Sequence, residues 1–231
     1  MSANSEQGQP QQEVEVAVDD RITIKGSLWL CEGAKGIVLF AHGSGSSRFS
    51  PRNRYVAGVL QQAGLATLLI DLLTKEEEKI DLQTRQLRFD IELLAERVIG
   101  ATKWLLANDK AKKLKIGYFG ASTGASAALV AAGRLADRVD AVVSRGGRPD
   151  LAGAELSKVK APTLLIVGGN DFVVIELNER AMEQLSTEKK LVIVPGAGHL
   201  FEEPGALEQV AQVAAEWFGG YLRSEENAER S

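Results

Sequence analysis

Apolar residues occur along this chain in two patterns, which predict two kinds of element. Short continuous runs are typical of strands buried on both faces, because a half-exposed strand alternates apolar and polar residues. Such runs lie at residues 36–41, 66–70, 116–119, 141–144, 163–167 and 191–194. Longer segments with helical spacing lie among and after them, at residues 53–63, 81–108, 124–135, 174–185 and 207–222. Strands that alternate with helices predict a mostly parallel sheet with helices on both faces.

The start of the chain has a different pattern. Residues 14–18 and 22–30 alternate apolar and polar side chains on either side of Asp19-Asp20, which predicts an antiparallel hairpin. We place this hairpin at one edge of the sheet. The expected fold class is therefore α/β, with a doubly wound, mostly parallel sheet of about eight strands.

The domain organisation follows from what interrupts the pattern. No linker rich in Pro or Gly divides the chain and no internal repeat is visible, so we expect a single domain over residues 13–223. Residues 1–12 and 224–231 are polar and are expected to be flexible tails.

Composition and charge narrow the classes of protein that remain. The chain has 231 residues and a net charge of −4, which gives no general reason to expect binding to nucleic acid or to a membrane surface. The single cysteine, Cys31, cannot form an internal disulfide, which indicates a reducing compartment. Residues 1–12 lack the apolar core of a signal peptide, and no apolar run reaches the length of about 18 residues that a spanning helix needs. We therefore expect a cytoplasmic monomer or small homo-oligomer with a small-molecule partner.

The segment Gly120-Ala121-Ser122-Thr123-Gly124 carries the strongest chemical signal. It lies between a predicted strand and a predicted alanine-rich helix. A serine between two glycines at such a turn is typical of a nucleophile elbow, in which the turn is too crowded for side chains at the glycine positions. The pattern predicts that Ser122 is a catalytic nucleophile.

A nucleophilic serine needs a base and an acid that orients the base. His199 is one of only two histidines and lies in a glycine-rich loop after the last predicted strand. Asp171 directly follows another predicted strand and could orient His199, although it could instead cap the helix that begins near residue 174. The order Ser122, Asp171, His199 favours a catalytic triad over a surface histidine.

The second histidine, His42, opens the glycine-rich loop 42–47. Backbone N–H groups in such a loop can turn inward, so the N–H groups of Ser44 and Thr123 are the expected oxyanion donors. His42 is expected to brace this loop or to contact substrate. Its use as the base is the alternative, and it would leave His199 without a role.

Charged residues near the predicted site leave more than one interpretation open. Arg48 and Arg145 follow strand ends and either are solvated or bind a carboxylate or phosphate group of the substrate, with Arg145 favoured. The acidic and basic residues at 72–83 form either a solvated loop and helix start or a small flap over the site.

The chain resembles the α/β-hydrolase superfamily, and within it the small branch of dienelactone-hydrolase-like proteins. The resemblance rests on residues 42–45, the elbow at 120–124, Asp171 and Gly198-His199, in that order. It implies that Ser122 is the nucleophile, His199 the base and Asp171 the acid. Dienelactone hydrolases proper use a cysteine nucleophile, so serine at this position points to ester hydrolysis more generally.

The expected reaction calls for no metal and no organic cofactor, and no cluster of histidine, cysteine or carboxylate residues has the spacing of metal ligands. The short stretch between residues 144 and 162 leaves no room for a large helical lid domain. The expected substrate is therefore a small ester or lactone that reaches an open site. The alternatives are a binding protein on a hydrolase scaffold, with slow or no turnover, and another triad chemistry such as that of a peptidase or an acyltransferase.

Overall fold

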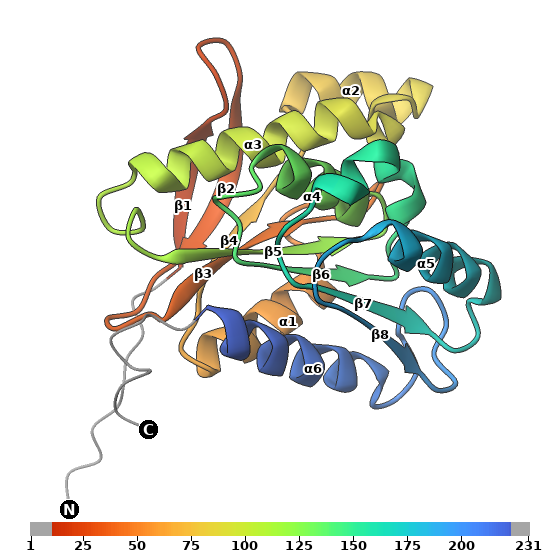
Figure 1. The fold of residues 1–231 in the computed structure, drawn as a ribbon. Helices are drawn as coiled ribbons and strands as arrows, with labels where there is room; N and C mark the ends of the chain where they lie inside the picture. The colour runs from red at the N-terminus through yellow and green to blue at the C-terminus, as the bar shows by residue number, and fades with distance from the viewer. Residues whose placement is uncertain (1–10, 223–231) are drawn as a thin grey trace, which may run out of the picture.

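The computed structural model of the chain describes residues 11–222, which form one mixed sheet covered by helices on both faces (Figure 1). The sheet has eight strands in the order β1-β2-β4-β3-β5-β6-β7-β8. Their bounds are β1 Gln12–Ala17, β2 Thr23–Trp29, β3 Gly36–Ala41, β4 Ala66–Ile70, β5 Lys115–Ala121, β6 Ala141–Arg145, β7 Thr163–Gly168 and β8 Lys189–Val194. This architecture confirms the predicted α/β sheet.

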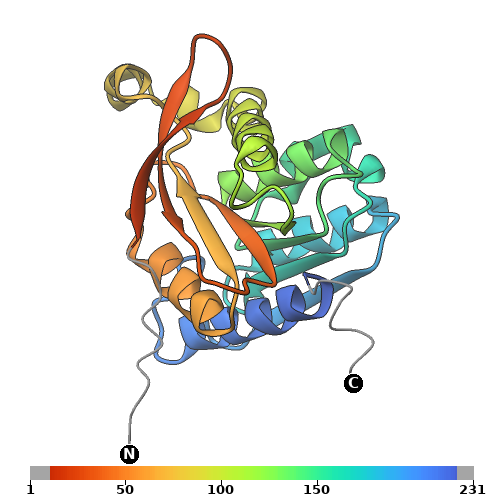
Figure 2. The same ribbon diagram turned by 90° about the vertical axis from the view of Figure 1, so that its left-hand side faces the viewer.

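Strand direction confirms the predicted edge hairpin. β1 pairs with β2, and β2 with β4, in antiparallel register, whereas the strands from β4 to β8 run parallel to one another. Figure 2 shows the β1–β2 hairpin at the edge of the twisted sheet. Because parallel strands end at a common edge, the loops that follow β3, β5, β6, β7 and β8 gather there.

The helices divide the core into two layers (Figure 1). Their bounds are α1 Pro51–Gln62, α2 Lys75–Thr84, η1 Leu87–Phe89, α3 Ile91–Ala107, α4 Thr123–Arg134, η2 Pro149–Lys158, α5 Phe172–Gln184 and α6 Ala206–Tyr221. One apolar cluster lies between the sheet and α1 and α6, and the other between the sheet and α3, α4 and α5. The sheet is therefore buried on both faces, as its continuous apolar strands predicted.

The prediction of a single helix over residues 81–108 was wrong. The structure has three elements there, because Arg85 adopts a left-handed conformation with φ of 55° and ends α2. The side chain of Asp90 then accepts a hydrogen bond from the N–H of Leu93 and starts α3 afresh. Helix α2 begins earlier than predicted, because Thr74 and Glu77 form a capping box.

The predicted tails at residues 1–12 and 224–231 lie outside the described residues, except for Gln11 and Gln12, and Gln12 already belongs to β1. Within residues 11–222, no helix combines the length and the apolar character needed to cross a bilayer.

Candidate active site

The turn between β5 and α4 has the strained geometry of a nucleophile elbow. Ser122 has φ of 51° and ψ of −121°, a conformation that side-chain-bearing residues rarely adopt. A Cβ atom on Gly120 would lie 2.3 Å from the first turn of α4. A Cβ atom on Gly124 would lie 2.3 Å from the carbonyl oxygens of Ala41 and His42. Both glycines are therefore required by close backbone packing.

The hydroxyl of Ser122 is not used to hold the helix that follows it. Ser122 occupies the N-cap position of α4, yet its side chain makes no capping hydrogen bond. Its backbone is fixed instead, because its N–H donates to the carbonyl of Arg145 at 3.2 Å. The side chain thus stands at the positive end of α4, where a developing negative charge is stabilised.

His199 and Asp171, which the sequence predicted to pair, are joined by a hydrogen bond. The His199 Nδ1–H donates to Asp171 Oδ2 at 2.6 Å. Asp171 is also the N-cap residue of α5, but its side chain makes no capping bond. The carboxylate is therefore committed to the imidazole, which fixes the tautomer and leaves Nε2 as the nitrogen that can accept a proton.

The loop that carries His199 packs against the loop that supports the elbow. A Cβ atom on Gly146 would lie 3.1 Å from the carbonyl oxygen of His199 and 3.6 Å from its ring carbon Cε1. Gly146 follows Arg145, whose carbonyl accepts the hydrogen bond from Ser122. The structure thus brings the loops after β5, β6, β7 and β8 together around Ser122, Asp171 and His199.

His42 has both ring nitrogens engaged. Its Nδ1–H donates to the carbonyl of Gly43 at 2.9 Å, and its Nε2 accepts from the N–H of Leu72 at 3.1 Å. Burial lowers the pKa of His42 from its ordinary value, which favours this neutral form. The geometry supports a bracing role for His42, because Nε2 is occupied and cannot serve as a base without breaking the contact with Leu72.

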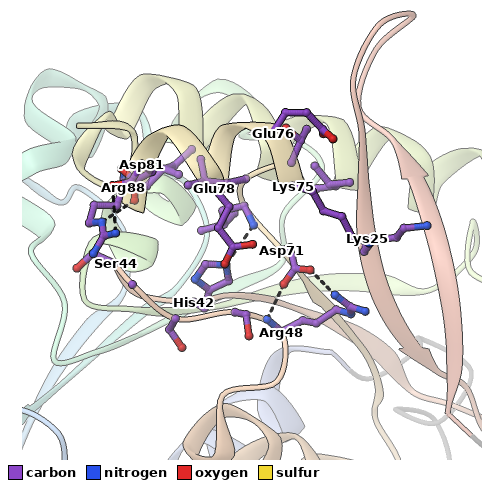
Figure 3. A pocket seen from close by; sticks show the side chains of 18 of the residues that line it. Lys25, His42, Ser44, Arg48, Asp71, Lys75, Glu76, Glu78, Asp81 and Arg88 are labelled. Carbon is purple, nitrogen blue, oxygen red and sulfur yellow. Dashed lines mark hydrogen bonds and ion pairs between the residues drawn. The ribbon is translucent and has the colours of Figure 1, made fainter. Parts of the chain in front are cut away.

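A pocket of about 990 Å³ lies beside this site (Figure 3). The loop from His42 to Phe49 forms its floor, and residues of β2, α2 and η1 enclose it. Both predicted oxyanion donors, Ser44 and Thr123, line the pocket. The sequence left open whether residues 72–83 form a solvated loop and helix start or a small flap. In the structure, most of this segment belongs to α2 and forms one wall of the pocket.

The two predicted substrate-binding arginines lie in different surroundings. Arg48 lines the pocket, and its guanidinium pairs with Asp71 and, at 2.7 Å, with Glu13. Burial opposes the charged form of Arg48, but these two carboxylates raise its pKa. Arg145 does not line the pocket, and its side chain is buried beside Asn53 on the α1 side of the sheet.

Two pocket residues were missed by the sequence analysis. Arg88 Nε donates to Asp81 Oδ2 at 2.6 Å, and the Arg88 N–H donates to Asp81 Oδ1 at 3.0 Å. Arg88 also reaches the glycine-rich loop 42–47, since a Cβ atom on Gly45 would lie 3.1 Å from its Nη1. Asp81 and Arg88 carry opposite charges at positions i and i+7. This spacing indicates an ion pair only once the chain is known to reverse direction at Arg85.

The sheet order, the elbow and the loops at the carboxyl ends of the strands define an α/β hydrolase. The model of the dienelactone hydrolase family matches residues 25–221. The chain therefore belongs to the dienelactone hydrolase family.

Solved structures agree with this assignment. A dienelactone hydrolase from Anabaena variabilis is 68% identical and superposes with a TM-score of 0.90, over 92% of this chain and 99% of that chain. Est1E from Butyrivibrio proteoclasticus shares the fold with a TM-score of 0.74 at 16% identity, over 90% of this chain and 98% of that chain. The likeness to Est1E shows the shared fold.

Curated relatives extend beyond the region that this chain matches. A putative phosphoribosyl transferase of Mycobacterium tuberculosis is 59% identical over 211 residues, which cover 91% of this chain and 46% of the relative. The chain thus spans about half the length of that relative.

Proposed function

We propose that the protein hydrolyses a carboxylic ester or lactone of a small molecule through a Ser122–His199–Asp171 triad. The observation that carries the proposal is the 2.6 Å hydrogen bond between His199 Nδ1 and Asp171, formed beside a strained serine turn. Asp171 at the helix N-cap position gives up capping for this bond, which is the arrangement a general base requires.

The reaction has two halves. In the first, His199 Nε2 takes the hydroxyl proton of Ser122 while the serine oxygen attacks the carbonyl carbon of the ester. The tetrahedral intermediate collapses to an acyl-enzyme, and the leaving alkoxide takes the proton from His199. In the second, His199 removes a proton from water, which attacks the acyl-enzyme, and Ser122 recovers its proton as the carboxylic acid leaves.

The oxyanion of each tetrahedral intermediate is expected to bind the backbone N–H groups of Ser44 and Thr123. The proposal is supported by the position of Thr123 as the first residue of α4 and by the location of both residues in the pocket lining. Loss of one such donor costs about 10²- to 10³-fold in kcat in a comparable serine enzyme. His42 supports this loop through Gly43 rather than entering the chemistry.

The test is hydrolysis of p-nitrophenyl acetate, p-nitrophenyl butyrate and a small lactone by the wild-type protein and by Ser122→Ala. We expect turnover by the wild type and a loss of about 10⁴-fold or more in kcat in the variant. Mass spectrometry after treatment with a fluorophosphonate should locate the adduct on Ser122. A folded wild-type protein that neither labels nor turns over any ester would contradict the proposal and favour a binding protein.

A further inference from the structure

One carboxylate in the large pocket is used neither by the fold nor by the proposed mechanism. The carboxylates that line this pocket belong to Asp71, Glu76, Glu78 and Asp81. Those of Asp71 and Asp81 are already taken, because an arginine pairs with each of them. Figure 3 shows the Glu76 carboxylate directed away from His42 and the Glu78 carboxylate directed from α2 toward it. Glu78 is therefore the carboxylate whose oxygens are presented to the interior of the pocket.

The carboxylate of Glu78 has no partner of its own. Across residues 11–222, its side chain makes no hydrogen bond and no ion pair. It lies close enough to His42 for its negative charge to oppose the lowering of the His42 pKa by burial. His42 does not bind it, since both ring nitrogens are engaged by the backbone of Gly43 and Leu72. The Glu78 oxygens thus remain available to a molecule in the pocket.

Hydroxyl groups of the same pocket are also unpaired. The side chains of Ser44 and Ser46 line the pocket, are exposed, and make no hydrogen bond to the part of the chain that the structure describes. Thr123 also lines the pocket and is only 4% exposed, and its Oγ1 has no partner within that part. Because buried polar groups are normally paired, an unpaired hydroxyl in a pocket lining points to a ligand that completes its hydrogen bonds.

The chemistry of these groups favours hydroxyl donors over a cationic ligand. A carboxylate accepts strong, charge-assisted hydrogen bonds from O–H or N–H groups, and serine and threonine hydroxyls both donate and accept. An ammonium group would be opposed by the cations of the pocket, which outnumber its carboxylates: Arg21, Lys25, Arg48, Lys75 and Arg88. Neutral hydroxyls avoid this repulsion. A carboxylate binds ribose hydroxyls in the same way in dinucleotide-binding folds.

We propose that the pocket binds a part of the ester or lactone substrate that carries neighbouring hydroxyl groups, as a sugar or polyol does, and that Glu78 accepts hydrogen bonds from those hydroxyls. The hydroxyls of Ser44, Ser46 and Thr123 complete the polar surface of this subsite. Its volume of about 990 Å³ is ample for such a group, since ligand pockets span about 300–1,000 Å³. This inference rests on the proposed ester hydrolysis and narrows its substrate to a hydroxylated one.

Binding is tested first without turnover, by NMR titration of Ser122→Ala with ribitol. Ribitol should shift the backbone amide signals of residues 42–47 and of α2, and 1,5-pentanediol, which has no neighbouring hydroxyls, should not. Adding Glu78→Gln should raise the apparent Kd for ribitol at least about tenfold, because a neutral amide forms weaker hydrogen bonds. Glu76→Gln, on the same helix, is the matched control and should leave this Kd unchanged.

Both substitutions remove one negative charge from an exposed position of α2, so a difference between them reports on contact with the ligand rather than on folding or net charge. An equal Kd for ribitol in the two double variants would overturn the inference. The absence of any response of Ser122→Ala to ribitol would also overturn it.

Substrate selectivity is tested with two pairs of compounds whose hydrolysis is followed by pH-stat. One pair is glycerol 1-butyrate and propyl butyrate, and the other is D-ribono-1,4-lactone and γ-butyrolactone. The ratio of kcat/KM for the hydroxylated compound to that for its partner should fall at least about tenfold in Glu78→Gln. Glu76→Gln should keep the wild-type ratios. The pair that responds identifies whether the alcohol or the acyl part of the substrate enters the pocket.

Failure of this inference can be told apart from failure of the proposed chemistry. Unchanged ratios in Glu78→Gln for both pairs, with activity lost in Ser122→Ala, would overturn the role of Glu78 and leave the triad intact. Conversely, full activity in Ser122→Ala would overturn the triad. The ribitol titration would then still decide whether Glu78 binds hydroxyl groups.

Discussion

The elbow around Ser122 and the pocket wall formed by α2 and η1 lie on either side of the glycine-rich loop 42–47, yet they are held by different forces. The elbow is fixed by backbone packing, with no room for a Cβ atom on Gly120 or Gly124. Helix α2 is held mainly by charged side chains, and Asp81 is its one buried residue. Large apolar side chains of the wall, such as Leu82 and Phe89, remain 68% and 57% exposed.

Under the proposed function, the elbow would serve catalysis and the wall would serve substrate recognition. Steric packing tolerates little change, so the positions of Ser122 and the carbonyls around it are set within narrow limits. Ion pairs at a partly exposed wall contribute less to the free energy of folding, and their side chains are more easily rearranged. We infer that the elbow determines the reaction, which changes little, whereas the residues of the wall determine which substrates are accepted.

The largest effect is expected at the triad. Asp171→Asn should lower kcat by about 10⁴-fold, because an amide cannot hold the His199 imidazole in the required tautomer. The matched control is Asp109→Asn, whose carboxylate is exposed and pairs with Lys112. Steady-state kinetics on p-nitrophenyl butyrate give the readout. A loss smaller than tenfold in Asp171→Asn would remove Asp171 from the triad.

The next largest effect is expected from filling the elbow. Gly124→Ala should lower the free energy of unfolding by at least about 3 kcal/mol, because its Cβ meets two carbonyl oxygens. Gly58→Ala is the matched control. Gly58 lies inside α1 with nothing within 4 Å of an added Cβ. Gly58→Ala should therefore increase the free energy of unfolding, by about 1 kcal/mol at most. Urea unfolding measures both, and equal effects would refute steric control of the elbow.

A smaller effect is expected at the pocket wall. Asp81→Asn removes the carboxylate that holds both the side chain and the N–H of Arg88. We expect a loss of about 1–3 kcal/mol of local stability, seen as faster hydrogen exchange in α2 and η1. KM should rise while kcat stays within about threefold, since the wall does not touch Ser122. A fall in kcat with unchanged KM would show that the two regions are not separate.

The smallest effect is expected from pH at His42, the residue between the two regions. Burial lowers its pKa, while its bond to Gly43 and the nearby Asp71 and Glu78 oppose that shift. The stability that neutral His42 contributes is complete above its unfolded pKa of about 6.5 and is lost as pH falls through its lower folded value. Protonated Nε2 cannot accept the Leu72 N–H, so protection of that amide should decrease on acidification.

Hydrogen exchange at the Leu72 amide, corrected for the intrinsic rate, follows this change. His42→Asn serves as the control, because it has no titrating ring and should show no such dependence. Constant protection of Leu72 in the wild type between about pH 7 and pH 4 would contradict the role given to His42.

The sequence predicted the parts of the site whose causes are local. The turn at residues 120–124 is determined by its own two glycines and the elements beside it, so a pattern of five residues is sufficient. The bond between Asp171 and His199 crosses 28 positions, but each residue follows its own strand, and parallel strands end at one edge.

The hydrophobic pattern of the sequence did not predict features that depend on side-chain direction or on a local reversal of the chain. The Asp81–Arg88 pair exists because Arg85 is left-handed, and helical periodicity carries no sign of that break. Arg145 was expected to be solvated or to bind substrate; it shares the alternate positions of Ala141 and Val143, so its side chain is buried toward the α1 layer.

The two hydrogen bonds of His42 also have a consequence for engineering. The His42 ring connects the glycine-rich loop 42–47 to the start of the pocket wall. A library of variants that alters His42 therefore changes the loop and the wall together. Lys75, Glu76 and Glu78 face the same pocket from α2 and are the positions to randomise. Variants there can be selected for new substrates while the reaction chemistry is inherited unchanged.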